Sequence, residues 1–434
     1  MAVGFGSAVA GASLALLFGS PTLQQAELSP EETRLVGGDR IVTGGYFGLP
    51  RLTQPVNIMV MGIKMLALDE QEGFQKRVNT FDGLADTILI ARFEPDTRQV
   101  RALSIPRDTR VNIPGHGWSK INATNVWGGP ALTAHTLDML LGGVEVDRYV
   151  RVNPMAVEAL VDALGGITLT VPEDMRYQDD SQHLYINLKA GRQRLNGKQA
   201  MAFLLFRYDR LGDIGRIQRQ QLFMRAFREE VLTPATLARL PQLLSAIQTY
   251  VDTNLTVEEI VALAGLVKEV QSDSFQMTLL PGQFSGQEYS ASYWLPDETR
   301  VQTVAAQFFQ ARPAAALSEG EGETPPSLAQ LRIAIQDSTD NPEAVAAVTD
   351  HLLGAGYRRI YEDVPWKVTL RQTQIIAQQG NLAAAQQLQG ILGFGAVRVE
   401  STGELYSDLT IQVGQDWKYG LKAVTSSAQT GERP

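Results

Sequence analysis

Arginine and aspartate side chains stand at the ends of two predicted strands. A proline closes the strand predicted over residues 100–105, and Arg107 and Asp108 follow it directly. Asp86 lies at the entrance of another strand, predicted over residues 87–92. An arginine fork binds phosphate oxygens in pairs, and a carboxylate beside it either orients the arginine or holds a divalent cation. The pattern therefore favours a site for a phosphorylated ligand.

A second polar group lies at the start of a helix that the sequence predicts after residue 212. Asp213, Arg216 and Gln220 are spaced three and four residues apart, so they share one face of that helix. Asp213 is also a good N-cap, and a helix N-terminus adds backbone donors and a positive end. The candidates here are Arg207, Asp213, Arg216, Arg219 and Gln220, together with Lys120 and Asn122 from a glycine-rich loop.

The distribution of charge agrees with an anionic ligand held at one place. The chain carries a net charge of −9, which argues against a general nucleic-acid binder. Between Arg192 and Arg228, however, nine residues are basic and only Asp209 and Asp213 are acidic. Two other interpretations remain open for these charges: a solvated basic helix face, and a network of arginine–aspartate pairs that serves only the fold.

Several other signatures of phosphate or metal chemistry do not fit the sequence. Five residues separate Gly191 from Gly197, where a P-loop has four, and Gln199 stands where that loop has Ser or Thr. No G-x-S-x-G nucleophile elbow occurs. The chain has no cysteine, and its four histidines are scattered without metal-ligand spacing.

Short apolar runs alternate with amphipathic stretches over most of the chain. Strands are predicted over residues 57–62, 87–92, 100–105, 149–152, 167–171 and 277–280. Helices are predicted over residues 130–141 and 154–164, after residue 212, and twice within 236–270. Strands that alternate with helices imply a sheet covered by helices, so the predicted fold class is α/β.

Composition divides the chain into six segments. The first is uncharged and apolar, and we interpret it as an N-terminal membrane anchor, with a cleaved signal or a buried helix as alternatives. The fourth is rich in proline and glutamate and is typical of a linker. The segments are the anchor at 1–20, a polar tether at 21–50, the main domain with a helical extension at 51–310, the linker at 311–327, a small separate α/β domain at 328–415 and a tail at 416–434.

At the charged residues the sequence resembles the LytR–CpsA–Psr domain in order and spacing. Ser-Ile-Pro-Arg-Asp and Gly-Asp-Ile-Gly-Arg-x-x-Arg-Gln are the most specific of its motifs here. The matching runs are Asn57–Gly62, Ala85–Thr87, Ser104–Asp108, Lys120–Asn122, Gly128-Gly129, Val161–Gly166 and Gly212–Gln221. They cover about residues 55–235. Residues 328–415 resemble the LytR-type domain that often follows.

The resemblance implies a three-layer α/β/α fold with a mixed sheet and an apolar tunnel for a polyprenyl-phosphate lipid. It also implies Mg²⁺ and transfer of a glycan phosphate to a sugar hydroxyl of peptidoglycan. By position, Asp86 would bind the metal or orient the arginines. The implied catalytic residues are Asp86, Arg107, Asp108, Arg207 and Arg216; the implied diphosphate ligands are Arg107, Lys120, Arg207, Arg216, Arg219 and Gln220, supported by Asp213, Asn122 and Lys64.

Three positions depart from the family pattern. Many members carry Asp where this chain has Lys64, and Arg where it has Leu84 and Leu205. The loss of one acid and two arginines implies a weaker dependence on Mg²⁺ and a weaker grip on the diphosphate. Lys64 would replace part of the lost positive charge.

The leading functional prediction is a phosphotransferase that attaches polyprenyl-diphosphate-linked glycopolymers to cell-wall peptidoglycan. Its partners would be the lipid-linked glycan, peptidoglycan and the membrane, without nucleic acid. We expect a single N-terminal anchor in the cytoplasmic membrane and a catalytic domain outside the cytoplasm. The alternatives are a lipid-diphosphate phosphohydrolase that uses the same residues, and a polyprenyl-phosphate-binding or regulatory membrane protein without catalysis.

Overall fold

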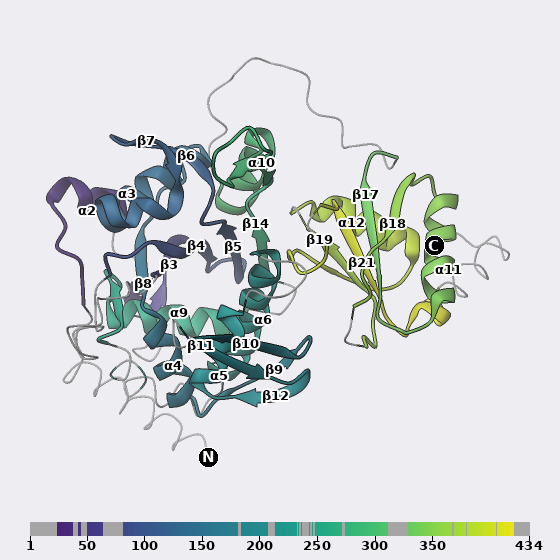
Figure 1. The fold of residues 1–434 in the computed structure, drawn as a ribbon. Coiled ribbons are helices and arrows are strands. Elements are labelled where there is room, and N and C mark those ends of the chain that lie inside the picture. Colours follow the sequence, from purple (N-terminus) through teal and green to yellow (C-terminus); the bar gives the residue numbers. More distant parts are fainter. Residues whose placement is uncertain are drawn as a thin grey trace.

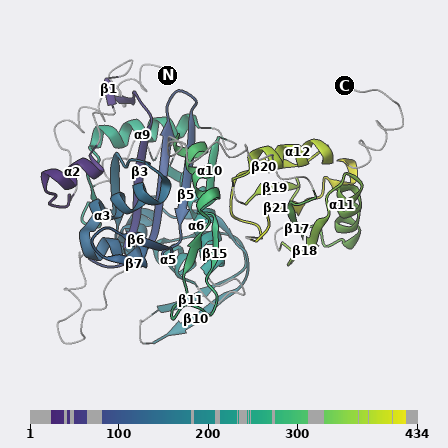
Figure 2. The same ribbon diagram turned by 90° about the horizontal axis from the view of Figure 1, so that it is seen from above.

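The computed structural model shows two units, each built on its own sheet, that lie side by side (Figures 1 and 2). The main domain contains residues up to 310, and the C-terminal domain begins at residue 329. The structure describes residues 24–37, 42–44, 50–63, 81–180, 184–206, 213–231, 233, 236, 243, 245, 248–270, 274–310, 329–366, 369–378, 380–404 and 406–420. The predicted linker at 311–327 lies outside these residues.

A six-stranded mixed sheet forms the centre of the main domain, as the sequence predicts. Its pairings β3–β8 and β5–β14 are parallel, and the other three are antiparallel. In spatial order the strands are β13 (Val251–Thr253), β8 (Arg148–Val152), β3 (Val56–Ile63), β4 (Ala85–Glu94), β5 (Gln99–Ile105) and β14 (Phe275–Leu279). The expected strands at 57–62, 87–92, 100–105, 149–152 and 277–280 are all present within one or two residues.

Helices cover both faces of this sheet, which confirms the α/β/α layering. On one face Met59, Ile90 and Leu103 pack in one cluster with residues of α3 (Thr124–Leu141) and α10 (Glu298–Phe309). On the other face strand residues pack against α9 (Val257–Glu269). Since β3 is buried on both sides, its sequence is an almost continuous apolar run rather than an alternating one.

Glycine and asparagine set the limits of two helices that the sequence predicts. The backbone of α3 is not helical at Gly128 and Gly129, so its regular part begins at Pro130 and ends at the left-handed Gly142 (φ 69°). Helix α4 (Pro154–Ala163) starts with the Asn153 side chain accepting a hydrogen bond from the N–H of Met155. Both match the predicted helices at 130–141 and 154–164.

A smaller layer of strands and helices completes the main domain. Its apolar cluster joins α4 to two antiparallel strand pairs and two further helices. These are β9 (Ile167–Val171) with β12 (Gly191–Leu195), β10 (Met175–Asp179) with β11 (Leu184–Leu188), α5 (Gly197–Leu205) and α6 (Asp213–Val231). Of these, β9 and α6 are predicted, whereas β10, β11, β12 and α5 are not.

Part of the predicted tether is structured. Helix α2 (Pro30–Val36) has a complete capping box at Ser29 and a proline in its first turn, and Val36 is buried in the main core. Strands β1 (Val42–Gly44) and β2 (Pro50–Leu52) pair with each other. The predicted anchor at 1–20 lies outside the described residues, and none of the helices within them is both long and apolar enough to cross a membrane.

The C-terminal domain is built on a five-stranded sheet with two helices. A small separate α/β domain in this part of the chain was expected from the sequence, and it is present. In spatial order the strands are β18 (Arg359–Glu362), β17 (Arg332–Asp337), β21 (Leu409–Val413), β19 (Gln374–Ala377) and β20 (Ala396–Arg398), with helices α11 (Pro342–Gly354) and α12 (Leu382–Leu392).

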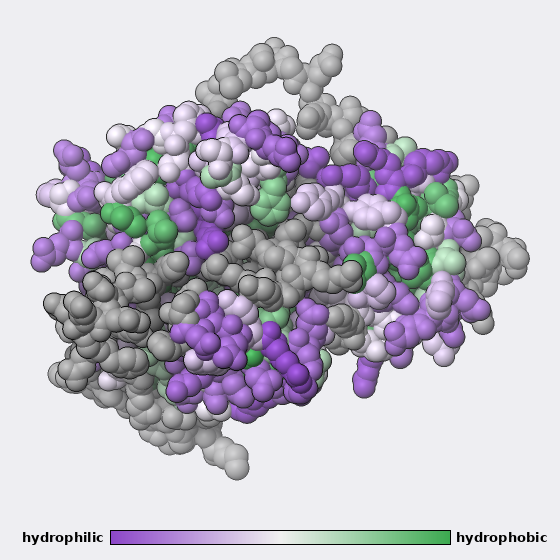
Figure 3. Space-filling model, in the orientation of Figure 1, coloured by the Kyte–Doolittle hydropathy of each residue, from purple (hydrophilic) through white to green (hydrophobic). Residues whose placement is uncertain are grey.

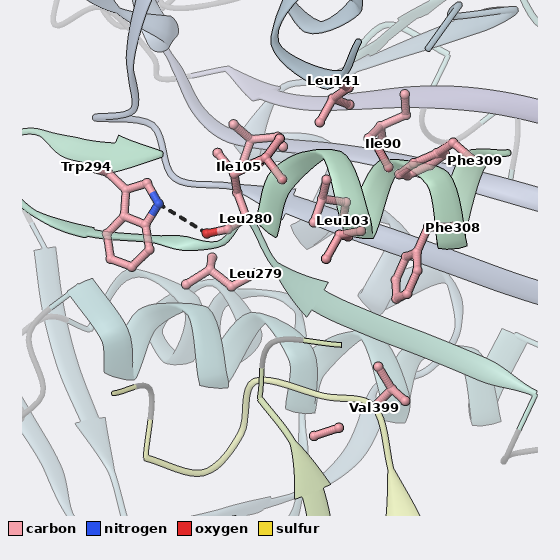
Figure 4. Close-up of a cluster of buried hydrophobic side chains, with 14 of the residues drawn as sticks. Ile90, Leu103, Ile105, Leu141, Leu279, Leu280, Trp294, Phe308, Phe309 and Val399 are labelled. Atoms are coloured by element: carbon pink, nitrogen blue, oxygen red, sulfur yellow. Dashed lines mark hydrogen bonds between the residues drawn. The ribbon is translucent and has the colours of Figure 1, made fainter. Parts of the chain in front are cut away.

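The C-terminal domain packs on the outer edge of β14. The N–H of Met277 donates to the carbonyl of Val399 at 3.0 Å, and the N–H of Leu279 donates to Ser401 Oγ at 2.9 Å. Val399 is buried in the same apolar cluster as Leu279 and Phe308, and Figure 4 shows it below the strand with Phe308 above. The two sheets are therefore separate, but their cores are continuous.

Candidate active site

Asp86 is placed by a β-bulge at the start of β4. Gly62 pairs with Thr87 and Ile63 pairs with Ala85, so Asp86 has no partner residue on β3. Strands β4 and β5 are antiparallel, which brings the start of one beside the end of the other. Arg107, two residues after β5, donates from Nη1 to Asp86 Oδ1 at 2.9 Å.

Asp86, Arg107, Asp108 and Lys120 form a chain of alternating charges, which we call the charged cluster. Arg107 Nε lies 3.5 Å from Asp108 Oδ2, and Lys120 Nζ lies 2.8 Å from Asp108 Oδ1. The four side chains are between 20% and 30% exposed. Partial burial strengthens their electrostatic interactions and leaves access for a ligand, so two cations held by carboxylates can receive an anion.

Backbone hydrogen bonds fix the segments that carry this cluster. The N–H of Asn122 donates to the carbonyl of Arg107 at 3.2 Å, and the N–H of Trp294 donates to the carbonyl of Asp108 at 2.9 Å. Asn122 is itself buried. In this structure the backbone of Asn122 therefore helps to hold Arg107 in position. Trp294 was not singled out from the sequence, because its partner lies far away along the chain.

Helix α6 contacts the start of β4 through Gln220. The amide Nε2 of Gln220 donates to Thr87 Oγ1 at 2.9 Å, next to Asp86. Arg219 is buried, its Nη2 donates to the carbonyl of Phe206, and its guanidinium lies 5.6 Å from the Phe206 ring. Thr87 and Phe206 were missed from the sequence, although Thr87 belongs to the Ala85–Thr87 motif.

The structure describes only part of the predicted site. It brings together Asp86, Arg107, Asp108 and Lys120 directly, and Gln220 through Thr87. Arg207 and Lys64 lie outside the described residues, as do the side chains of Asp213 and Arg216, although the backbone of α6 begins at Asp213. The roles predicted for these residues remain predictions.

Two apolar side chains stand at positions where the family pattern has arginine. Leu84, one residue before β4, and Leu205, at the end of α5, are 36% and 38% exposed. Both precede residues of the predicted site: Leu84 comes two residues before Asp86, and Leu205 two residues before Arg207. These leucines add no positive charge at the two positions.

The carboxylates of the charged cluster are the protein ligands that a metal ion could have at this site. Among the described residues no group of three or more His, Cys, Asp or Glu side chains could hold a metal. Asp86 and Asp108 are paired with Arg107 and Lys120. Magnesium usually takes one or two protein carboxylates together with substrate phosphates. The carboxylates among the described residues therefore fit Mg²⁺ only when phosphate oxygens of a ligand supply its remaining coordination positions.

A mixed sheet covered by helices on both faces, with arginine, lysine and aspartate joined at the ends of β4 and β5, defines an α/β protein with a charged cluster beside its central sheet. The LytR_cpsA_psr family model matches residues 31–310, and the model of the LytR cell envelope-related transcriptional attenuator domain matches residues 330–417. The chain belongs to the LytR–CpsA–Psr family and carries the LytR-type C-terminal domain, as the sequence motifs predict.

Named relatives and solved structures are similar to the main domain. The regulatory protein MsrR of Staphylococcus aureus is 32% identical over 197 residues, which span 45% of this chain and 56% of MsrR. The polyisoprenyl-teichoic acid–peptidoglycan teichoic acid transferase TagV of Bacillus subtilis is 28% identical over 260 residues, which span 58% of this chain and 63% of TagV. The matched region is thus less than two thirds of either relative.

Two crystal structures support the fold. That of Bacillus subtilis TagV superposes with a TM-score of 0.50 at 26% identity and covers 60% of this chain and 99% of that one. Protein gbs0355 of Streptococcus agalactiae gives a TM-score of 0.53 at 22% identity and covers 61% of this chain and 91% of that one.

Proposed function

We propose that this protein is a phosphotransferase that moves a glycopolymer from a polyprenyl diphosphate to a sugar hydroxyl of peptidoglycan. The observation that carries the proposal is the charged cluster, which offers Arg107 and Lys120 to an anion at the ends of β4 and β5. The name of the relative TagV, a teichoic acid transferase, supports the same reaction class. The predicted location outside the cytoplasm, with a membrane anchor, belongs to this proposal.

In the proposed reaction, the acceptor hydroxyl oxygen attacks the phosphorus that carries the glycan. The bond from that phosphorus to the bridging oxygen breaks, and polyprenyl monophosphate leaves with the bonding electron pair. The hydroxyl proton passes to a carboxylate of the cluster or to the departing phosphate. Arg107 and Lys120 stabilise the charge that develops on the phosphate oxygens, a contribution that is usually large in such sites.

The other predicted residues complete the site in this proposal. Arg207 and Arg216 bind the diphosphate from the α6 side and take part in catalysis, Gln220 binds it beside Thr87, and Asp213 orients the arginines. Arg219 is buried and donates to the Phe206 carbonyl, so in this proposal it acts on the phosphates mainly through its charge. Bound Mg²⁺ would neutralise phosphate charge, with Asp86 as its protein ligand.

The apolar face of the sheet beside Asp86 offers a place for the lipid chain. Leu89, Ala91, Ala102 and Met277 are buried and cluster only with other strand residues among the described ones. Thr87, Leu89 and Ala91 alternate along β4, so this face begins at the Gln220 contact. We propose that the prenyl chain lies along it, with its phosphates at the charged cluster.

The function can be tested with the full chain, a purified lipid-linked glycopolymer and peptidoglycan glycan strands. We expect glycan phosphate to become covalently attached to the strands, and polyprenyl monophosphate to appear in equal amount. Release of free glycan phosphate without attachment would instead identify a phosphohydrolase. The name of MsrR favours a regulatory protein as a further candidate. Tight donor binding without any turnover would support that candidate and reject the transferase.

Magnesium should stimulate the native protein less than a Lys64→Asp variant. A lysine at a position where many relatives have aspartate removes an oxygen ligand and adds an ammonium that repels the cation. The measurement is a Mg²⁺ titration of transfer by both proteins, at equal donor concentration. If the native protein requires Mg²⁺ as strictly as the variant does, the proposed role of Lys64 is wrong.

A further inference from the structure

An aromatic and polar surface lies next to the charged cluster, on the hairpin of β6 (Arg110–Ile113) and β7 (Gly117–Lys120). The register pairs Arg110 with Lys120 and Asn112 with Trp118. Because residues two apart on a strand point to the same side, these four side chains share one face of the hairpin. Val111, on the opposite face, is buried in the main core. We call the four-residue face the hairpin platform.

Trp118 is held in place and yet accessible. Its side chain is 61% exposed, one of the largest exposures of an aromatic residue in the described part of the chain. The guanidinium of Arg110 lies 4.2 Å from the centre of the indole ring and 5.3 Å from that of Tyr289. This cation–π contact orients the indole before any ligand arrives, which lowers the entropy cost of binding.

The platform is continuous with the candidate active site through Lys120. Lys120 Nζ lies 2.8 Å from Asp108 Oδ1 and 5.5 Å from the centre of the Tyr293 ring. Trp118 and Lys120 are two residues apart on β7, a separation of about 7 Å along the strand. A sugar stacked on Trp118 would therefore have its neighbour in the glycan close to the charged cluster.

We propose that the hairpin platform binds the acceptor, as a strand of N-acetylated sugars stacked on Trp118. The C–H groups on one side of a pyranose ring pack on the negative face of an indole, and hydroxyl and amide groups at the rim need hydrogen-bond partners. Asn112 is exposed beside Trp118, and Arg110 supplies donors. The interpretation of the bound sugar as an acceptor rests on the proposed function.

A lipid surface is the alternative ligand for an exposed tryptophan. The neighbours of Trp118 on the platform are Asn112, Arg110 and Lys120, and none of them is apolar. On the face that Figure 3 shows, the described surface of the main domain is mostly hydrophilic, and apolar residues form separate patches. A hydroxylated polymer therefore suits the platform better than hydrocarbon does.

Direct binding tests the proposal without any transfer reaction. Purified peptidoglycan glycan strands, freed of peptides, are titrated into the full chain without donor, and binding is followed by calorimetry. We expect Trp118→Ala to weaken binding about tenfold and Trp118→Phe to retain most of it. Tyr185→Ala is the matched control, because Tyr185 is 59% exposed on β11 and should not affect strand binding. Equal affinity of native protein and Trp118→Ala would overturn the proposal.

Two further measurements separate this proposal from the proposed function. If transfer occurs, Trp118→Ala should raise the KM for the strands and leave kcat and donor affinity unchanged. If strands bind through Trp118 but no transfer occurs, the platform stands and the transferase function fails. Vesicles of anionic phospholipid provide the last comparison. Should Trp118→Ala reduce binding to vesicles while strand binding stays the same, the platform is a membrane contact and the proposal is wrong.

Discussion

Replacing Arg107 with alanine should lower the rate of glycopolymer transfer by about 100- to 1,000-fold while the melting temperature stays nearly unchanged. Arg107 bridges Asp86 and Asp108 at the end of β5, where it can meet the phosphate charge that develops during transfer. Its ion pairs are partly exposed and Asp108 keeps its pair with Lys120, so their loss should cost less stability than the loss of a fully buried pair. Arg107→Lys should recover only part of the activity, because lysine keeps the charge but not the two-pronged geometry. The measurements are single-turnover transfer rates and thermal unfolding.

Variants of two other arginines serve as comparisons for this test. Arg98→Ala removes an exposed pair with Glu269 at 3.1 Å and should change neither activity nor stability. Arg216→Ala, at the start of α6, should behave like Arg107→Ala if the helix start binds phosphate. If activity is lost only together with the fold in the Arg107 variant, the charged cluster is a structural ion-pair network, the interpretation that the sequence leaves open.

Replacing Arg151 with methionine should destabilise the protein by about 3–5 kcal/mol, because it leaves the Asp252 carboxylate buried without its cation. Arg151 and Asp252 are 7% and 2% exposed, and Arg151 Nε donates to Asp252 Oδ2. Arg151 also donates to the Phe81 carbonyl at 3.2 Å and to Asn125 Oδ1 at 3.3 Å, which hold the segment before Asp86. Chemical denaturation at neutral pH measures the loss.

The pH dependence of this variant follows from the state of Asp252. Burial raises the pKa of Asp252 above its ordinary value, and Arg151 opposes that rise. An acid whose pKa is raised in the folded state favours folding at low pH, and this contribution is lost as the pH rises through the folded pKa. Without Arg151 the pKa should rise further, so the stability deficit should shrink as the pH is lowered from neutral. A second change, Asp252→Asn, should recover part of the stability at neutral pH. A deficit that is independent of pH would contradict this account.

Local sequence predicts the central sheet well because its strands are buried apolar runs with clear ends. The segments around Asp86 and Arg107 were assigned to two consecutive strands, and the antiparallel pairing of β4 with β5 brings the two side chains together. The bulge that places Asp86 was not predicted, because a single extra residue leaves no mark on hydrophobic periodicity. The prediction of a site at these residues came from the arginine–aspartate pattern at the strand ends and from the family motif.

Other parts of the fold depend on contacts that local patterns do not encode. The hairpin at 110–120 was not predicted, since its strands have four residues each, Pro114 and Gly115 lie between them and β7 begins with a glycine. Among the strands at 175–195, β12 is almost entirely polar, and β10 and β11 alternate over only five residues each. The packing of Val399 on β14 joins residues more than a hundred positions apart, so it follows from the folded surfaces and not from either segment.

The contact between Val399 and β14 has a consequence for the behaviour of the protein in solution. An uncovered edge strand offers unpaired N–H and C=O groups on which a strand of another molecule can add, and growth from such edges leads to aggregates. Here the β14 edge is occupied by residues 399–401, and the opposite edge, at β13, receives a bridge from Gln24 to Asp252. Residues from these two segments thus occupy both edges of the central sheet. They disfavour edge-to-edge strand pairing between copies of the molecule.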